Sequence, residues 1–183
     1  MQNYEELFEK LNAKIWDYAE LKFEEYQSSE ALIDMMKAHG FSVERGLAGM
    51  DTAFRATAGK GRPVIGLLAE YDALSGLSQK AGQLEPIPRK GTENGHGCGH
   101  CLLGTAAAGA ALMAKDYLIQ TGRGGTVVLN RCPTEEGGSG KAYLARAGVF
   151  DDLDAALTWH PAGGNAVLTG SLQANCQAYH TLL

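Results

Sequence analysis

The sequence predicts an α/β fold in which helices flank a mostly parallel β-sheet. Three apolar stretches are typical of buried strands, namely residues 63–69, 126–129 and 155–159. The segments between them, residues 102–120 and 141–147, are typical of helices. Regular alternation of strand and helix favours layered folds with parallel strands, because a parallel connection has to cross over the sheet.

The first third of the chain is expected to contribute two helices and two short strands. Apolar side chains recur at helical spacing over residues 4–25 and predict the first helix. The second helix is expected to start after Ser28 or Ser29, either of which suits an N-cap, and to stop at Gly40. The strand candidates are residues 41–43, 52–57 and, near the end of the chain, 173–183.

Composition indicates an ordinary globular chain. It has 183 residues, 45% hydrophobic and 20% charged, and this length suits one domain. The net charge of −5, without a run of Lys or Arg, argues against a nucleic-acid partner. We expect no membrane association, because no apolar run approaches the ~20 residues needed to span a bilayer. The acidic start lacks a secretory signal, so four cysteines favour reduced thiols and a cytoplasmic location.

The densest group of reactive side chains lies in residues 95–101. His96, Cys98, His100 and Cys101 are interleaved there with glycines, at the end of a long connection and at the start of a helix. Such a cluster is typical of either a metal site or a redox site. A helix N-terminus would favour the thiolate form of Cys98 in both cases.

Other polar groups follow the predicted strands. Glu70 and Asp72 follow residues 63–69, Glu135 and Glu136 follow residues 126–129, and His160 follows residues 155–159. Ligands of open α/β sheets bind outside the carboxyl ends of the strands, so one shared site is expected. With a thiolate and imidazoles beside carboxylates, the site suits a borderline divalent ion such as Zn²⁺ or Mn²⁺.

Each candidate also has a simpler interpretation. A Glu-Glu pair is usually a solvated loop, and Asp72 could be a helix N-cap. His160, which precedes a proline, could simply end a strand. The Cys98–Cys101 spacing at a helix N-terminus resembles the active site of the protein disulfide isomerases, which leaves a thiol–disulfide redox protein as an alternative. The functional interpretation depends on several candidates converging at one sheet edge.

Four motifs carry a resemblance to a known family. They are Leu68-Ala-Glu-Tyr-Asp-Ala-Leu74, Asn94-Gly-His-Gly-Cys-Gly-His100, Pro133-Thr-Glu-Glu-Gly-Gly-Ser-Gly-Lys141 and Thr158-Trp-His-Pro161. In order and spacing the chain resembles the M20 metallopeptidases of the amidohydrolase branch. The resemblance extends to about residue 178 and implies a zinc-peptidase-like catalytic domain. Residues 1–183 would be its N-terminal part, without the dimerisation domain and the C-terminal part of the catalytic domain.

The resemblance also implies roles for individual residues. Cys98, His100, Glu136 and His160 would be metal ligands, for two ions of Zn²⁺ or Mn²⁺. Glu135 would be the general base that activates water, with Asp72 as a supporting residue. The reaction would be hydrolysis of the amide bond of a small N-acyl or aminobenzoyl amino acid, such as p-aminobenzoyl-glutamate. Family members dimerise or pair with a homologous subunit.

Two features depart from the family pattern. Cys101 stands where the family usually has Asp or Asn, which affects the hydrogen bonding expected around His100 and offers an extra thiol ligand. Family members are also more than twice as long, and the missing half supplies a further metal-binding histidine. The chain alone is therefore expected to bind metal weakly and turn over little. A non-catalytic remnant or a partner-binding subunit is the alternative.

Overall fold

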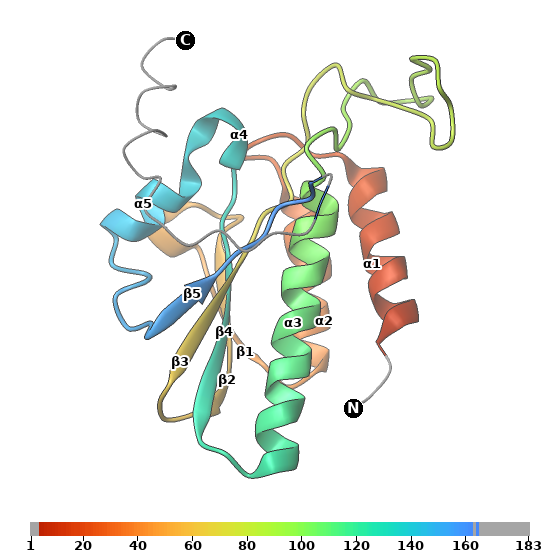
Figure 1. The fold of residues 1–183 in the computed structure, drawn as a ribbon. Coiled ribbons are helices and arrows are strands. Elements are labelled where there is room, and N and C mark those ends of the chain that lie inside the picture. Colours follow the sequence, from red (N-terminus) through yellow and green to blue (C-terminus); the bar gives the residue numbers. More distant parts are fainter. Residues whose placement is uncertain (1–3, 163, 165–183) are drawn as a thin grey trace.

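A computed structural model describes residues 4–162 and residue 164 as a five-stranded sheet with helices packed against it (Figure 1). The strands are β1 (Ser42–Arg45), β2 (Phe54–Lys60), β3 (Val64–Ala69), β4 (Gly125–Arg131) and β5 (Ala155–Leu157). The helices are α1 (Glu5–Tyr18), α2 (Tyr26–Ala38), α3 (His100–Thr121), α4 (Glu135–Gly138) and α5 (Gly140–Arg146), with a 3-10 turn at Leu47–Gly49. The candidate strand over residues 173–183 lies outside the described residues.

The sheet has the order β1-β2-β4-β3-β5 and confirms the α/β class. β3 runs parallel to both β4 and β5, whereas β2 runs antiparallel to β1 and β4. The sheet is therefore mixed, with its parallel part at β4-β3-β5. β1 and β2 are antiparallel because the connection between them, residues 46–53, is too short for a crossover.

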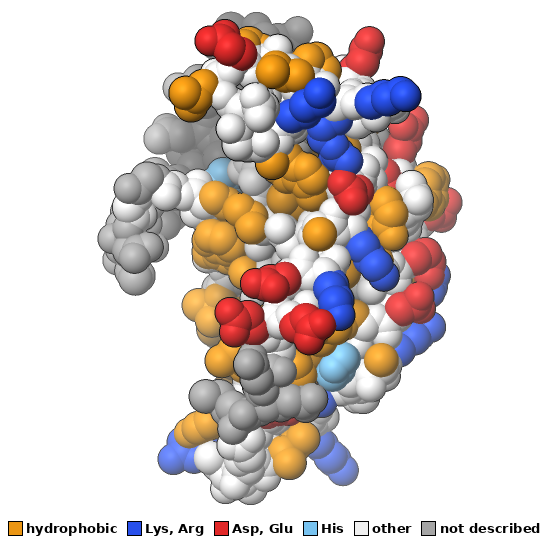
Figure 2. Space-filling view, turned by 90° about the vertical axis from the view of Figure 1, so that its right-hand side faces the viewer, with side chains coloured by type: hydrophobic (Ala, Val, Ile, Leu, Met, Phe, Trp, Pro, Cys, Tyr) orange, Lys and Arg blue, Asp and Glu red, His pale blue; other side chains and the backbone are white. Residues whose placement is uncertain are grey.

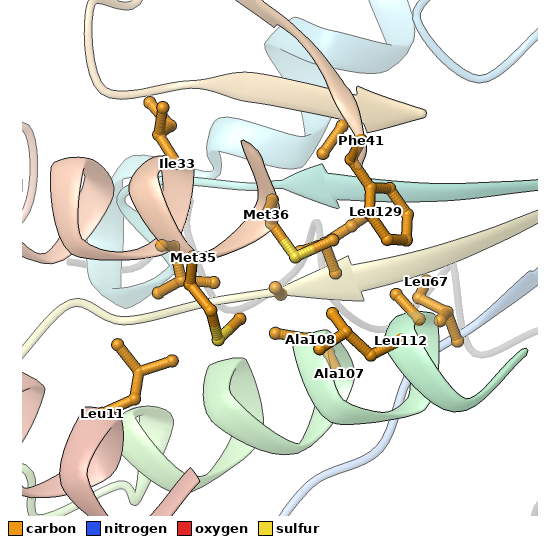
Figure 3. Packing of buried hydrophobic residues seen from close by; sticks show 14 of the residues in the cluster. Leu11, Ile33, Met35, Met36, Phe41, Leu67, Ala107, Ala108, Leu112 and Leu129 are labelled. Atoms are coloured by element: carbon orange, nitrogen blue, oxygen red, sulfur yellow. The ribbon is translucent and has the colours of Figure 1, made fainter. Parts of the chain in front are cut away.

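The main hydrophobic core lies between the sheet and the first three helices. Figure 3 shows Leu11 of α1, Met36 of α2 and Leu112 of α3 around Leu67 and Leu129 of the sheet. Met35 and Met36 of α2 are both buried in this core. A smaller cluster comprises Leu47, Ala53, Cys132 and Leu144.

α3 is the central helix of this layer. By length and composition alone it is apolar enough to cross a membrane, but its Ala- and Gly-rich face is buried against β3, β4 and α1. A Cβ atom at Gly104 would lie 1.6 Å from the ring of Tyr71, so glycine is required for this close approach. α3 is thus the core helix of an α/β layer.

The prediction of one helix over residues 4–25 is wrong, because α1 ends at Tyr18. Ala19 adopts a left-handed conformation (φ 43°), and the connection that follows contacts the segment after β3. The side chain of Glu20 then accepts hydrogen bonds from the backbone N–H groups of Gln27 and Ser28, each at 2.8 Å. This carboxylate caps α2 from outside the helix.

The predicted N-caps of α2 are therefore wrong as well. Ser28 and Ser29 lie inside the first turns of the helix and are buried. The hydroxyl group of Ser28 donates to Glu20, and that of Ser29 donates to the carbonyl oxygen of Thr52. α2 ends at Ala38, and Gly40 follows with φ 80°. The predicted stop of this helix at Gly40 is therefore confirmed.

β5 is the predicted third strand, although its three residues are exposed rather than buried. Among the described strands it pairs with β3 alone, and it forms an edge of the sheet that they make. The opposite side of the molecule is covered by α1. Figure 2 shows acidic and basic side chains intermixed with hydrophobic ones on that face, where Lys10 pairs with Glu6.

Candidate functional site

The three parallel strands bring the polar segments that follow them to one edge of the sheet. Glu70 and Asp72 follow β3, the Glu135 segment follows β4, and His160 follows β5. The N-terminus of α3 brings His100 to the same edge. The sheet topology therefore assembles this group from segments far apart in the sequence.

The donor atoms at this edge form two overlapping sets. The Cys98 Sγ atom lies 3.2 Å from Nε2 of His160, and Nε2 of His100 lies 3.3 Å from Glu70 Oε2 and 3.9 Å from Glu135 Oε2. Within the set Cys98, His100 and His160 the ligand atoms lie within 4.8 Å of one another, as they do within the set Glu70, His100 and Glu135. His100 belongs to both sets and is the centre of the site.

His100 is completely buried, and its two ring nitrogens have different surroundings. Nδ1 lies 3.0 Å from Oδ1 of Asp72 and is hydrogen-bonded to it. Nε2 faces the carboxylates of Glu70 and Glu135 but makes no hydrogen bond with either. A histidine held by a carboxylate at one nitrogen, with the other directed at further donor atoms, has the arrangement of a metal ligand. The residues thus fit a divalent cation.

Asp72 supports two parts of the site at once. Besides His100, it accepts a hydrogen bond from the backbone N–H of Glu136 at 2.7 Å. Burial opposes its charge, but the hydrogen bonds and the nearby His100 together lower the pKa of Asp72. No helix follows Asp72 directly, so the alternative that it caps a helix is wrong. Asp72 also supplies the hydrogen bond to His100 that Cys101 cannot make.

Cys101 points away from this group. It is 1% exposed and belongs to the main hydrophobic core. Burial raises the pKa of its thiol to about 11. The possibility that Cys101 adds a ligand is therefore not supported, and its departure from the family pattern leaves the donor sets intact.

Glu135 and Glu136 occupy different positions, as expected for neighbours on a loop. Burial raises the pKa of Glu135; Lys141 opposes this effect, whereas the nearby Glu70 adds to it. A carboxyl group with a raised pKa suits general acid–base chemistry near neutral pH. Glu136 lies outside both three-residue sets, and its carboxylate contributes to the raised pKa of the Cys98 thiol.

Two charged residues of the site had no assigned role in the sequence analysis. Glu70 is buried, with one carboxylate oxygen facing His100 and the other paired with the ammonium group of Lys141. The two-residue spacing of Glu70 and Asp72 was the available signal, because side chains two apart in an extended segment share one face. Lys141 carries no comparable signal, since its position depends on how α5 packs.

The loop that carries the glutamates has an unusual backbone. Thr134 adopts a left-handed conformation (φ 59°), which costs about 1–3 kcal/mol for a residue other than glycine. A Cβ atom at Gly138 would lie 2.3 Å from the Thr134 hydroxyl oxygen, and one at Gly140 would lie 1.9 Å from the carbonyl oxygen of Pro133. The glycines of this motif therefore permit a tight conformation that the surrounding structure must stabilise.

His96 anchors the other end of the site. It is buried, and its Nε2 atom lies 3.0 Å from the carbonyl oxygen of Ile15 in the last turn of α1. This hydrogen bond joins His96 to a helix 81 positions away in the sequence. His96 ties the loop before α3 to the N-terminal helix.

The geometry does not support the redox alternative. Burial, together with Glu136, Glu135 and Glu70, raises the pKa of Cys98 to about 12. Burial and these carboxylates oppose the thiolate that the helix N-terminus is expected to favour. Within the described residues Cys98, Cys101 and Cys132 are free thiols. A dithiol oxidoreductase requires the opposite shift of its attacking thiol.

Alkylation of the thiols is the direct measurement. With a pKa of about 12, Cys98 should react slowly with iodoacetamide at pH 8 after treatment with EDTA, since roughly one thiol in 10⁴ is ionised. The rate should rise about tenfold per pH unit between pH 7 and 9, because each unit multiplies the thiolate fraction by ten. Mass spectrometry distinguishes Cys98 from the buried Cys101 and Cys132. Rapid modification that is independent of pH would restore the redox interpretation.

Comparison with known proteins tests whether the chain belongs to the family that its motifs resemble. The profile of Peptidase family M20/M25/M40 matches residues 66–175. A p-aminobenzoyl-glutamate hydrolase subunit of Escherichia coli (strain K12) is 53% identical over 165 residues, covering 90% of this chain and 34% of that protein. An IAA-amino acid hydrolase of Arabidopsis thaliana is 31% identical over 182 residues, covering 95% and 37%. The chain spans about a third of the length of these curated relatives.

A solved structure shows the same fold. A dinuclear metal-binding peptidase of the M20 family from Bacillus subtilis superposes with a TM-score of 0.69 at 22% sequence identity, covering 82% of this chain and 41% of that chain. The profile match includes more than half of the chain and contains all the donor residues described above. The chain therefore belongs to peptidase family M20/M25/M40.

Proposed function

We propose that this chain is the metal-binding part of an enzyme that hydrolyses an amide bond. The observation that carries this proposal is the buried Nε2 atom of His100, which lies between two carboxylates without hydrogen-bonding to them. A thiol and a second imidazole also lie close to the same ring. Family membership and the 53% identity to a hydrolase subunit support the same function.

The proposed ligands are Cys98, His100, Glu136 and His160, and the donor set suits two borderline divalent ions, Zn²⁺ or Mn²⁺. Glu70 is a further candidate, because its buried carboxylate faces Nε2 of His100 at 3.3 Å. The dinuclear centre named for the peptidase from Bacillus subtilis supports the count of two.

Such ions, when bound, supply Lewis-acid polarisation of the substrate carbonyl and acidify water. Glu135 is the proposed general base: its carboxylate accepts the proton of the attacking water and donates it to the leaving amine nitrogen. Its raised pKa favours the first of these transfers, because it makes the carboxylate a stronger base. Asp72 holds the ring of His100 in one orientation and the backbone of Glu136 in place.

The remaining parts of the proposal concern the whole protein. The substrate class is an N-acyl or aminobenzoyl amino acid such as p-aminobenzoyl-glutamate, after the activity named for the Escherichia coli relative. That relative is one subunit of its enzyme, which supports pairing with a homologous chain. Residues 1–183 are proposed as the N-terminal part of a longer catalytic domain. The free thiols of the described cysteines favour a cytoplasmic location.

Metal titration of the purified chain tests the site. The wild-type chain should bind Zn²⁺ or Mn²⁺, and His100→Ala should weaken binding by more than about 10–100-fold, the effect usual for residues that only support a ligand. His39→Ala is the matched control, because His39 caps α2 away from this edge of the sheet. Equal affinities for wild type and His100→Ala would remove His100 from the site. Hydrolysis of p-aminobenzoyl-glutamate should be measured in a full-length protein that carries this sequence.

A further inference from the structure

A second buried charge cluster lies behind the proposed general base. Glu25, at the N-terminus of α2, and Arg131, the last residue of β4, are both completely buried. The Glu25 Oε2 atom lies 3.5 Å from Arg131 Nη2 and accepts a hydrogen bond from the Thr52 hydroxyl at 3.1 Å. The guanidinium group also lies over the ring of Tyr71, 5.3 Å from its centroid.

The other carboxylate oxygen of Glu25 contacts the loop that carries Glu135. Oε1 accepts a hydrogen bond from the backbone N–H of Thr134 at 2.7 Å. Thr134 is the residue in the left-handed conformation, and it directly precedes Glu135. On the far side of Glu135, the N–H of Glu136 is bound by Asp72 at the same distance. Two buried carboxylates therefore hold the amides on either side of Glu135.

We propose that Glu25, with Arg131 as its counter-ion, is a positioning residue for Glu135. The hydrogen bond to Thr134 stabilises a conformation that a β-branched residue rarely adopts, and this conformation aims the Glu135 side chain at His100. Arg131 is the oppositely charged neighbour of the Glu25 carboxylate, and both side chains are completely buried. The proposal rests on the proposed role of Glu135 as the general base.

A merely structural ion pair would stabilise the whole domain, whereas a positioning residue acts on residues 133–140. Two double variants separate these cases. Glu25→Gln with Arg131→Met removes both charges but retains a carbonyl oxygen that can accept from Thr134. Glu25→Leu with Arg131→Met removes the acceptor as well. Both replace a buried ion pair by neutral side chains, so neither leaves an unpaired charge.

Amide hydrogen exchange on the purified chain, read by NMR, is the measurement. The Thr134 amide should exchange about fivefold faster or more in the leucine variant than in the glutamine variant, as loss of one hydrogen bond implies. The amides of Val128 and Leu129 in β4 should exchange at equal rates in both. Equal Thr134 rates in the two variants would overturn the proposal, as would an equal increase across β4.

The wild-type chain gives a test that needs no variant. Its Thr134 amide should be protected from exchange although it lies in a loop, and exchange at the rate of a free amide would also overturn the proposal. Thr52→Val is the control on the same carboxylate, because it removes the hydrogen bond to Oε2 without touching the loop. Thr134 should remain protected in this variant. Since exchange does not depend on catalysis, failure of Glu135 as a base would appear only in hydrolysis assays.

Discussion

Glu135→Gln should lower the rate of amide hydrolysis about 10²–10⁴-fold in a full-length protein that carries this sequence, with metal binding retained. The amide keeps the size of the side chain but cannot accept and return a proton. Bound metal should be measured on the same samples, so that loss of the general base is distinguished from loss of the ions. Glu9→Gln is the matched control, because Glu9 is an exposed residue of α1 and belongs to neither donor set.

Two outcomes for Glu135→Gln would contradict the assignment of Glu135 as the general base. Activity close to that of the wild type would remove Glu135 from its role. Loss of metal together with activity would instead make Glu135 a ligand, which its place in the set with Glu70 and His100 also allows. The pH profile of hydrolysis gives a further test. The raised pKa of Glu135 should appear in the acid limb of the wild-type profile and be absent from that of the glutamine variant, because the amide does not titrate.

Arg131→Met should lower the free energy of unfolding by about 3–5 kcal/mol, the usual cost of leaving one member of a buried ion pair. The variant retains side-chain bulk but leaves the carboxylate of Glu25 without its counter-ion and without water. Urea unfolding followed by circular dichroism measures the change. Arg45→Met is the control, because Arg45 pairs with Glu30 on the surface, where such pairs contribute about 0–1 kcal/mol.

If Arg131→Met and Arg45→Met prove equally mild, the buried pair contributes little, and the charge on Glu25 is compensated elsewhere. Adding Glu25→Leu to Arg131→Met should recover much of the lost stability, because neutral side chains of similar size replace buried ion pairs without penalty. Recovery of stability without recovery of Thr134 protection would show that Glu25 acts separately as a partner of Arg131 and as the acceptor for the Thr134 amide.

The sequence was sufficient for the α/β class and for the edge of the sheet where the site lies. The apolar runs at residues 63–69 and 126–129 identify buried parallel strands, and the polar groups after them must then meet. The resemblance to the M20 metallopeptidases also implies different roles for Glu135 and Glu136. These inferences depend on chain order and strand direction, which local patterns determine well.

Features that depend on packing between distant segments could not be predicted. The first helix is expected to reach residue 25, yet α1 stops at Tyr18, where the chain turns to contact the segment after β3. The contacts of Glu25 with Thr134 and of His96 with Ile15 join residues 109 and 81 positions apart. The raised pKa of Cys98 is another such feature, since it results from burial and from carboxylates that follow β3 and β4.

Because both carboxylate oxygens of Asp72 are engaged, this residue links amino-acid substitutions in two separate segments. One oxygen holds His100 and the other holds the backbone of Glu136, so a single short side chain joins segments that are otherwise independent in sequence. Substitutions in the segment before α3 and in the loop after β4 will therefore show epistasis, because a shift of either one moves the carboxylate shared by both. Variation at one segment is tolerated only in sequences whose other segment accommodates it, with Asp72 retained between them.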